Sequence, residues 1–177
     1  MFGTPGINST TTSAAIIAAI NGPAAGLGMI MSLYCDVRFA SDAAVFSTAF
    51  ARRGLIAEHG ISWMLPKLIG LQNALDLTLT ARKFTAVEAK DMGLVSKVFP
   101  MESFMDDVHA YAMEMANMVS PRSVRVMKRQ IYQAMLNSLE HSVLLANSEM
   151  PASFESEDFK EGVAHFVERR SPKFTGR

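Results

Sequence analysis

The chain has 177 residues with 17 basic and 17 acidic side chains, and hydrophobic residues make up 49% of it. This length and composition predict a globular chain that can bury a core. A net charge of zero provides no long-range field for a polyphosphate backbone, so we do not expect nucleic acid as a partner. The single cysteine, Cys35, excludes an internal disulfide and a cysteine-rich zinc site, and it fits a reducing cytoplasm.

Residues 1–13 combine Gly, Pro, Ser, Thr and Asn without periodicity and predict an irregular arm. No basic region precedes the first apolar run, and no apolar run approaches the roughly 20 residues that a membrane span needs. We therefore expect a cytoplasmic protein without a membrane span.

Residues 14–100 predict a mixed α/β core, because strand-like and helix-like runs alternate along them. Residues 14–20 form a continuous apolar run that Asn21 and Gly22 end, which is typical of a strand buried on both faces. Thr85 followed by Glu88 three residues later predicts a capped helix start. The expected strands cover 14–20, 36–40, 45–47 and 93–100, and the expected helices cover 27–35, 60–69, 71–80 and 84–89.

Residues 101–177 predict a helical C-terminal region, because apolar residues recur there at helical spacing. The expected helices cover 101–119, 121–147 and 155–169.

A glycine-rich turn, "NGPAAGLGMIM" over 21–31, follows the first strand. It is not a phosphate-binding P-loop, because Met29 follows its last glycine where lysine is needed, and Met31 stands where a dinucleotide fingerprint needs glycine. Such a turn can leave the first amides of a helix exposed at the positive end of the helix dipole, which suits a developing oxyanion. The alternative is that the glycines only allow strand and helix to pack closely.

The stretches "IAAINGPAAGLG" (17–28), "CDVRFASDAAVFSTAFARRGLIAEHG" (35–60) and "EDFKEGVAHFVERRSPKFTGR" (157–177) resemble the crotonase superfamily of enoyl-CoA hydratases and isomerases. The resemblance implies a crotonase/ClpP-like spiral of ββα turns that is N-terminally truncated here, and a helical C-terminal region that forms homotrimers or hexamers. It implies an acyl-CoA thioester as substrate, with coenzyme A as part of that substrate and no separate cofactor. We expect no metal site, since the histidines lack a second ligand at helical spacing.

In this family two backbone amides hold the thioester oxygen as it becomes an enolate. By the motif, one donor here is the amide of Leu27, between Gly26 and Gly28. Typical hydratases carry two glutamates, and their positions are occupied here by Ile30 and Phe50.

Glu58 occupies the position of an acid found in isomerase-like members, so it is the candidate base. One carboxylate can move a proton from C2 to C4 of a 3-enoyl-CoA and so shift the double bond without water. The alternatives are a hydratase that uses Glu58 and a bound water, and a non-catalytic acyl-CoA binding or assembly protein. Glu58 could also cap the helix that begins near Gly60.

Three further residues are candidates for substrate binding. Trp63 lies just after the Glu58 loop and suits either an acyl-pocket wall or the core. By the resemblance, Phe166 and Arg169 reach the adenine and phosphate of coenzyme A, whereas Arg169 and Arg170 could simply complement a helix dipole.

Overall fold

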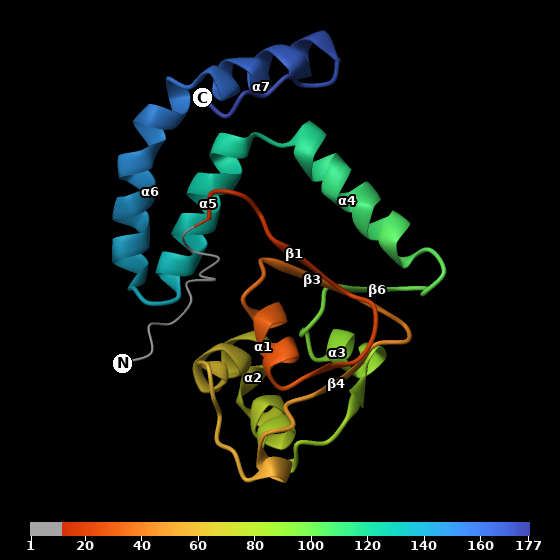
Figure 1. Cartoon of the computed structure of the whole chain (residues 1–177). Coiled ribbons are helices and arrows are strands. Elements are labelled where there is room, and N and C mark those ends of the chain that lie inside the picture. The colour runs from red at the N-terminus through yellow and green to blue at the C-terminus, as the bar shows by residue number, and fades with distance from the viewer. Residues whose placement is uncertain (1–11) are drawn as a thin grey trace. The chain divides into compact units, whose positions relative to one another are not determined.

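The computed structural model describes residues 12–177, which fall into two compact units (Figure 1). One unit spans Ile16–His109, and the other combines Ala110–Arg177 with residues 12–15. Residues 1–11 of the predicted arm lie outside the described residues, so that prediction is not tested.

The first unit contains six short strands and the helices that connect them. Its elements are β1 (Ile17–Ile20), β2 (Ala24–Ala25), α1 (Leu27–Leu33), β3 (Val37–Ser41), β4 (Val45–Ser47), the 3₁₀ turn η1 (Ala51–Arg53), α2 (Ile61–Thr80), β5 (Phe84–Thr85), α3 (Ala86–Asp91), β6 (Lys97–Phe99) and the start of α4 (Phe104–Met118).

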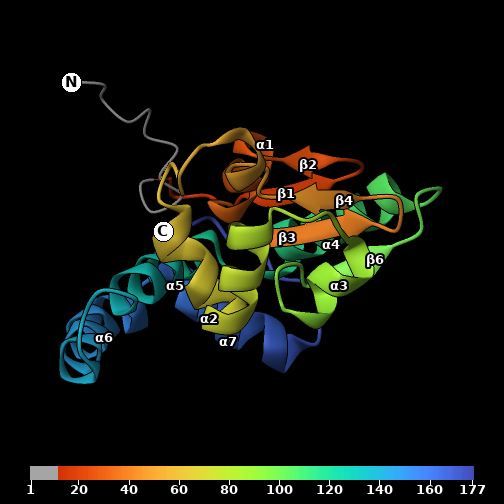
Figure 2. The same ribbon diagram turned by 90° about the horizontal axis from the view of Figure 1, so that it is seen from below.

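The strands form two small sheets, seen from below in Figure 2. One has the order β1-β3-β6 with all strands parallel, and Ile17 lies opposite Val37 in it. The other has the order β2-β4-β5, with β2 parallel and β5 antiparallel to β4. Its core includes Phe46 stacked on Phe84, with 5.4 Å between ring centroids. The prediction of an α/β core is confirmed.

The prediction for the first strand is wrong in two respects. β1 begins at Ile17 rather than at residue 14, and it lies at the edge of its sheet, where Ala19 is exposed. A continuous apolar run is typical of a strand whose two faces are both covered by other elements, and in β1 one position of the run, Ala19, stays exposed. Among residues 12–177, β1 pairs only with β3.

α2 confirms the predicted break at Gly70, whose φ of 77° and ψ of 160° are not helical, although helical structure continues to Thr80. Only glycine adopts such a conformation at low cost. α3 confirms the predicted cap: the Glu88 amide donates to the Thr85 hydroxyl, and the Glu88 carboxylate accepts from the Thr85 amide.

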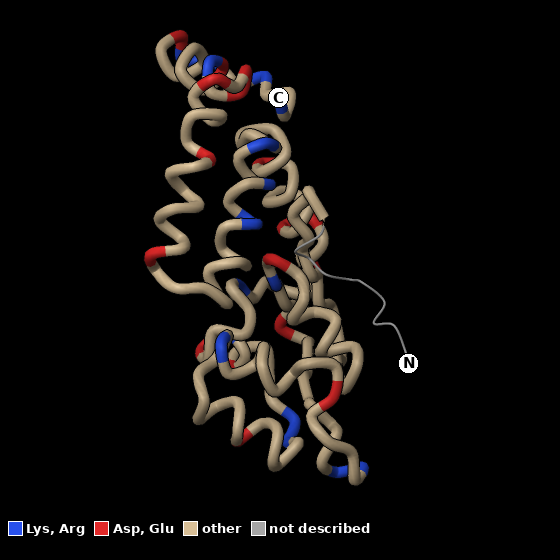
Figure 3. Tube along the Cα trace, turned by 90° about the vertical axis from the view of Figure 1, so that its left-hand side faces the viewer, with Lys and Arg blue, Asp and Glu red and all other residues tan. Residues whose placement is uncertain are grey.

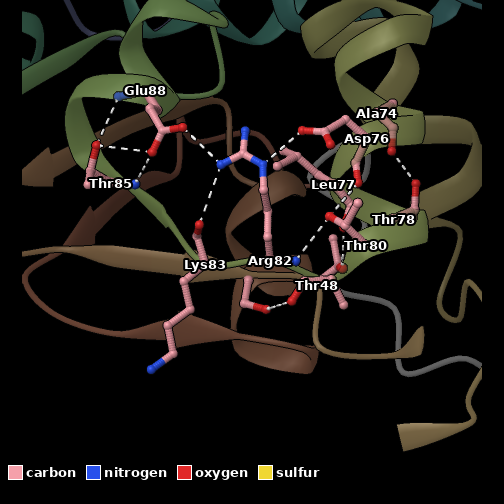
Figure 4. Close-up of polar contacts among 12 residues, drawn as sticks. Thr48, Ala74, Asp76, Leu77, Thr78, Thr80, Arg82, Lys83, Thr85 and Glu88 are labelled. Carbon is pink, nitrogen blue, oxygen red and sulfur yellow. Dashed lines mark hydrogen bonds and ion pairs between the residues drawn. The ribbon is translucent and has the colours of Figure 1, made fainter. Parts of the chain in front are cut away.

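Arg82 joins the end of α2 to α3 (Figure 4). Its guanidinium contacts Asp76 at 2.9 Å and Glu88 at 2.8 Å. The hydrogen bond from the Thr85 amide, followed by that from Arg82, lowers the pKa of Glu88. These contacts fix the chain where it leaves α2 and enters β5 and α3.

The second unit is helical and contains the rest of α4 with α5 (Pro121–Ala134), α6 (Leu139–Phe154) and α7 (Glu157–Glu168). α5 and α6 lie side by side (Figure 1). The predicted single helix over 121–147 is wrong, because residues 135–138 separate two helices. Ser138 caps α6 by accepting from the His141 amide at 3.2 Å, a local bond that serine favours over continued helix.

The C-terminal tail of this unit is held by the buried carboxylate of Asp158. It accepts from the Ser120 hydroxyl at 2.6 Å and from the amides of Thr175 and Gly176 at 2.8 and 3.0 Å. Burial alone would raise the pKa of Asp158, but these hydrogen bonds together lower it.

Basic and acidic residues are interspersed along the trace (Figure 3). In the described part of the chain, no helix combines the length and the apolar character needed to cross a bilayer.

Candidate functional site

The glycine-rich turn connects β2 to α1. Gly26 precedes the helix with φ 53° and ψ −123°, a conformation that side-chain-bearing residues avoid, and its amide donates to the Ser47 carbonyl at 3.1 Å. A Cβ on Gly26 would meet its nearest atom only at 4.0 Å, and one on Gly28 would meet nothing within 4 Å. The glycines are therefore not explained by close packing. Gly26 is needed for the turn, and Gly28 leaves open space beside the helix start.

α1 has a buried face and an exposed face. Leu27 is its first residue and is 54% exposed, and its amide has no acceptor within the helix. Ile30 is only 1% exposed and faces the core with Met29 and Leu33. The position that holds a glutamate in typical hydratases is therefore filled by a core side chain.

The second such position is also apolar and buried. Phe50 is 7% exposed and follows β4, where the chain is fixed to α2 by two side chains. The Ser47 hydroxyl donates to the Ala81 carbonyl at 3.1 Å, and the Thr48 hydroxyl donates to the Leu77 carbonyl at 2.8 Å. Since Ser47 also accepts from Gly26, the end of β4 supports the glycine-rich turn.

Glu58 lies in the loop before α2, and 36% of its side chain is exposed. Its carboxylate lies 3.8 Å from Nε2 of His59, and its carbonyl accepts from the Ile61 amide. The side chain does not cap α2, because Gly60 is the capping residue and no side chain bonds the helix start. Glu58 therefore does not cap α2 through its side chain.

Trp63 is on the first turn of α2 and is 41% exposed, so it is not part of the core. The Lys67 ammonium lies 4.8 Å from the centre of its ring. Gly26, Leu27, Gly28, Glu58 and Trp63 all belong to the unit Ile16–His109.

Phe166 and Arg169 belong to the other unit, at the end of α7. Phe166 is 79% exposed, and Arg169 is exposed and closes the helix with a left-handed φ of 53°. Neighbouring Arg170 binds Glu161, and this bond holds the pKa of Glu161 at about 2. Thus Arg170 is engaged in an ion pair, whereas Arg169 is an exposed residue at the helix end.

Among residues 12–177, no three His, Cys, Asp or Glu side chains are placed to hold a metal ion together. A hollow of about 310 Å³ between α7 and the tail is lined by Glu157, Asp158, Lys160, Glu161, Ala164, Lys173 and Thr175. None of the predicted site residues lines it.

Sequence reasoning missed Tyr34, at the end of α1. Its hydroxyl donates to the carbonyl of His59 at 2.5 Å and so ties α1 to the Glu58 loop. No local pattern indicates this bond, because the partners are 25 residues apart in the sequence.

Residues 8–177 match the family model described as enoyl-CoA hydratase/isomerase. The chain is 36% identical over 162 residues to a probable enoyl-CoA hydratase of Rhodobacter capsulatus, covering 92% of this chain and 63% of that protein. It is 32% identical over 162 residues to the 1,2-epoxyphenylacetyl-CoA isomerase of Escherichia coli, covering 92% of this chain and 62% of the isomerase. The chain therefore spans somewhat less than two thirds of the length of these relatives.

Solved structures agree with this relationship. A probable enoyl-CoA hydratase/isomerase from Mycobacterium abscessus superposes with a TM-score of 0.93 at 26% identity, over 97% of this chain and 67% of that one. An enoyl-CoA hydratase from Bacillus anthracis gives 0.92 at 31% identity, over 96% and 65%. With the parallel β1-β3-β6 sheet, the glycine-rich turn and the C-terminal helices, these matches show that the chain has the crotonase fold and belongs to the enoyl-CoA hydratase/isomerase family.

Proposed function

We propose that this chain carries an acyl-CoA site at the glycine-rich turn and shifts the double bond of an enoyl-CoA. The Leu27 amide donates to the thioester oxygen as charge develops on it, and the Glu58 carboxylate moves the proton from C2 to C4. Removing one such donor typically costs about 10²–10³ in rate. The exposed start of α1 and the open space beside Gly28 support this assignment, because a ligand can approach the amide.

Isomerisation is favoured over hydration because the two positions that hold glutamate in typical hydratases are buried and apolar here. Ile30 is 1% exposed and Phe50 is 7% exposed. Neither position offers a carboxylate, whereas Glu58 lies in the loop before α2 with 36% of its side chain exposed. Hydration needs one group to activate water and a proton delivered to the α-carbon. A double-bond shift needs only one group that takes up a proton and returns it.

Phe166 and Arg169 are proposed to bind the coenzyme A end of the substrate. A ring that is 79% exposed is free to stack on adenine, and an exposed guanidinium beside it is free to bind a phosphate. Trp63, with Leu27, is proposed to line the path of the acyl chain, because both are apolar and exposed in the same unit.

A homotrimer, or a hexamer of two trimers, is the proposed assembly. Large apolar side chains are exposed along all four C-terminal helices, and an assembly would remove them from water. They are Met105, Met113, Met118, Met127, Ile131, Val143, Leu144, Met150, Phe154, Phe159, Val163 and Val167. Light scattering on the purified chain measures this, and a monomer at all concentrations would contradict it. A cytoplasmic location stays a prediction.

Two alternatives each have one observation in their favour. The name of the Rhodobacter capsulatus relative favours a hydratase, which would use Glu58 and a bound water. The buried apolar side chains of Ile30 and Phe50, at both positions where typical hydratases carry glutamate, favour a non-catalytic acyl-CoA binding or assembly protein.

The test compares the full chain with Glu58→Gln and, as a matched control, Glu114→Gln on the exposed surface of α4. Binding of an acyl-CoA is followed by the fluorescence of Trp63, the single tryptophan. Conversion of a 3-enoyl-CoA is followed by the absorbance of the conjugated product. We expect Glu58→Gln to keep binding and lose turnover by about 10² or more, while the control keeps both.

Each other outcome selects an alternative. Hydration of a 2-enoyl-CoA that depends on Glu58 supports the hydratase. Binding without any turnover, unaffected by Glu58→Gln, supports the non-catalytic protein and rejects isomerisation.

A further inference from the structure

Tyr34 links the two elements that carry the proposed site residues Leu27 and Glu58. It caps the C-terminal end of α1, the helix whose first residue is Leu27, and its hydroxyl donates to the His59 carbonyl at 2.5 Å. Glu58 directly precedes His59 in the chain. One hydrogen bond therefore connects the helix of the proposed oxyanion donor to the loop of the proposed base.

The loop has a conformation that needs such support. His59 and Gly60 both have left-handed backbones, with φ of 51° and 75°. A left-handed conformation is costly for a residue with a side chain and persists when the surroundings hold it. The turn is closed by hydrogen bonds from Ile61 to the Glu58 carbonyl and from Trp63 to the Gly60 carbonyl, each 3.1 Å. The backbone thus reverses directly after Glu58.

Tyr34 also occupies the space beside Gly60. A Cβ added to Gly60 would lie 2.7 Å from the Tyr34 oxygen, which is closer than real Cβ contacts come. The hydroxyl is therefore packed on the backbone of the turn as well as bonded to it. Contact between α1 and α2 adds to this link.

We propose that Tyr34 is a positioning residue that holds the Glu58 carboxylate in register with the Leu27 amide. The proposal rests on the proposed function, in which these two groups act on the same thioester. A general base must lie within hydrogen-bond reach of the proton that it takes. A displacement of about 1 Å in such a group can cost about 10² in rate, so a bond that fixes the loop affects turnover rather than affinity.

The first measurement does not depend on activity. Hydrogen exchange of the Ile61, Trp63 and Met64 amides, which close the turn, is compared in the wild type, in Tyr34→Phe and in the control Tyr111→Phe on α4. Loss of one net hydrogen bond predicts exchange of these amides about five-fold faster in Tyr34→Phe. Amides of β3 and the Tyr111→Phe variant should be unchanged. Equal exchange in wild type and Tyr34→Phe would overturn the proposal.

The second measurement tests the contact itself. Gly60→Ala is made in the wild type and in Tyr34→Phe, and the shift of the unfolding midpoint is compared. In Tyr34→Phe the hydroxyl that an alanine Cβ at position 60 would meet is absent, while the left-handed φ of that position remains. Gly60→Ala should therefore lower the unfolding midpoint less in the Tyr34→Phe background than in the wild type. Equal shifts would show that the two residues do not interact and would overturn the proposal.

The third measurement tests positioning. If the wild type isomerises a 3-enoyl-CoA, Tyr34→Phe should lower kcat about ten-fold with KM unchanged, and Tyr111→Phe should change neither. Faster exchange of the turn together with an unchanged kcat would overturn the positioning role. If the wild type shows no turnover, the proposed function fails. The exchange and double-variant measurements then decide whether Tyr34 holds the Glu58 loop in place.

Discussion

Ile30→Glu places an acid at the position where typical hydratases carry one, and the structure predicts that it destabilises the fold. Ile30 is 1% exposed on the core face of α1. Burial of such a side chain contributes about 1.5–3 kcal/mol, which the exchange removes. An uncompensated buried charge adds about 3–5 kcal/mol. The total is comparable to the whole free energy of unfolding of a small domain, about 5–15 kcal/mol.

Chemical denaturation followed by circular dichroism measures this loss in the free energy of unfolding. Ile30→Leu is the control, because it conserves the side-chain volume and should lower the free energy of unfolding by less than about 1.5 kcal/mol. Burial raises the pKa of the new carboxyl, so the folded state binds more protons than the unfolded state. The penalty should therefore shrink as the pH falls below neutrality. If Ile30→Glu were as stable as the wild type and also hydrated crotonyl-CoA, the reasoning that this buried face of α1 cannot accept a carboxylate would be refuted.

Three further predictions concern stability. Phe46→Ala removes a ring stacked on Phe84 and should cost about 3–5 kcal/mol in denaturant unfolding, whereas Phe46→Leu should cost much less. Glu88→Gln should cost about 0.5 kcal/mol near neutral pH, because the pair with Arg82 is partly exposed. Since the pKa of Glu88 is lowered in the fold, this difference should disappear as the pH falls through and below its ordinary value of 4.5, and a constant difference would contradict it. Asp158→Asn should speed proteolysis of the C-terminal tail, unlike Glu157→Gln.

Sequence alone predicted the elements whose signals are local. The capping box at Thr85 and Glu88, the break at Gly70 and the β4 strand all follow from residues within a few positions of one another. Such signals act through backbone conformation and short-range hydrogen bonds, so they can be recognised without knowledge of the tertiary contacts. The family followed from motifs with fixed spacing, and the comparisons confirm it.

Two of the features that sequence alone missed depend on partners far away in the chain. The place of β1 at the edge of its sheet depends on which strands pair with it, and an apolar run looks the same at an edge and at the centre of a sheet. The division of residues 121–147 into α5 and α6 shows the opposite case, where a local cap at Ser138 interrupts a continuous helical pattern. The bond from Tyr34 to His59 joins residues whose approach only the fold determines.

The site itself combines both kinds of information. The motif identifies Leu27 and Ile30 as positions of interest, but it does not say which of them faces water. In a helix, residues three apart can fall on either side of the boundary between core and solvent, and here Leu27 lies outside and Ile30 inside. An acid at position 30 would thus oppose the packing of α1, whereas Glu58 lies in a loop and meets no such penalty. The packing of one short helix therefore supports the proposed double-bond shift, which needs a single carboxylate.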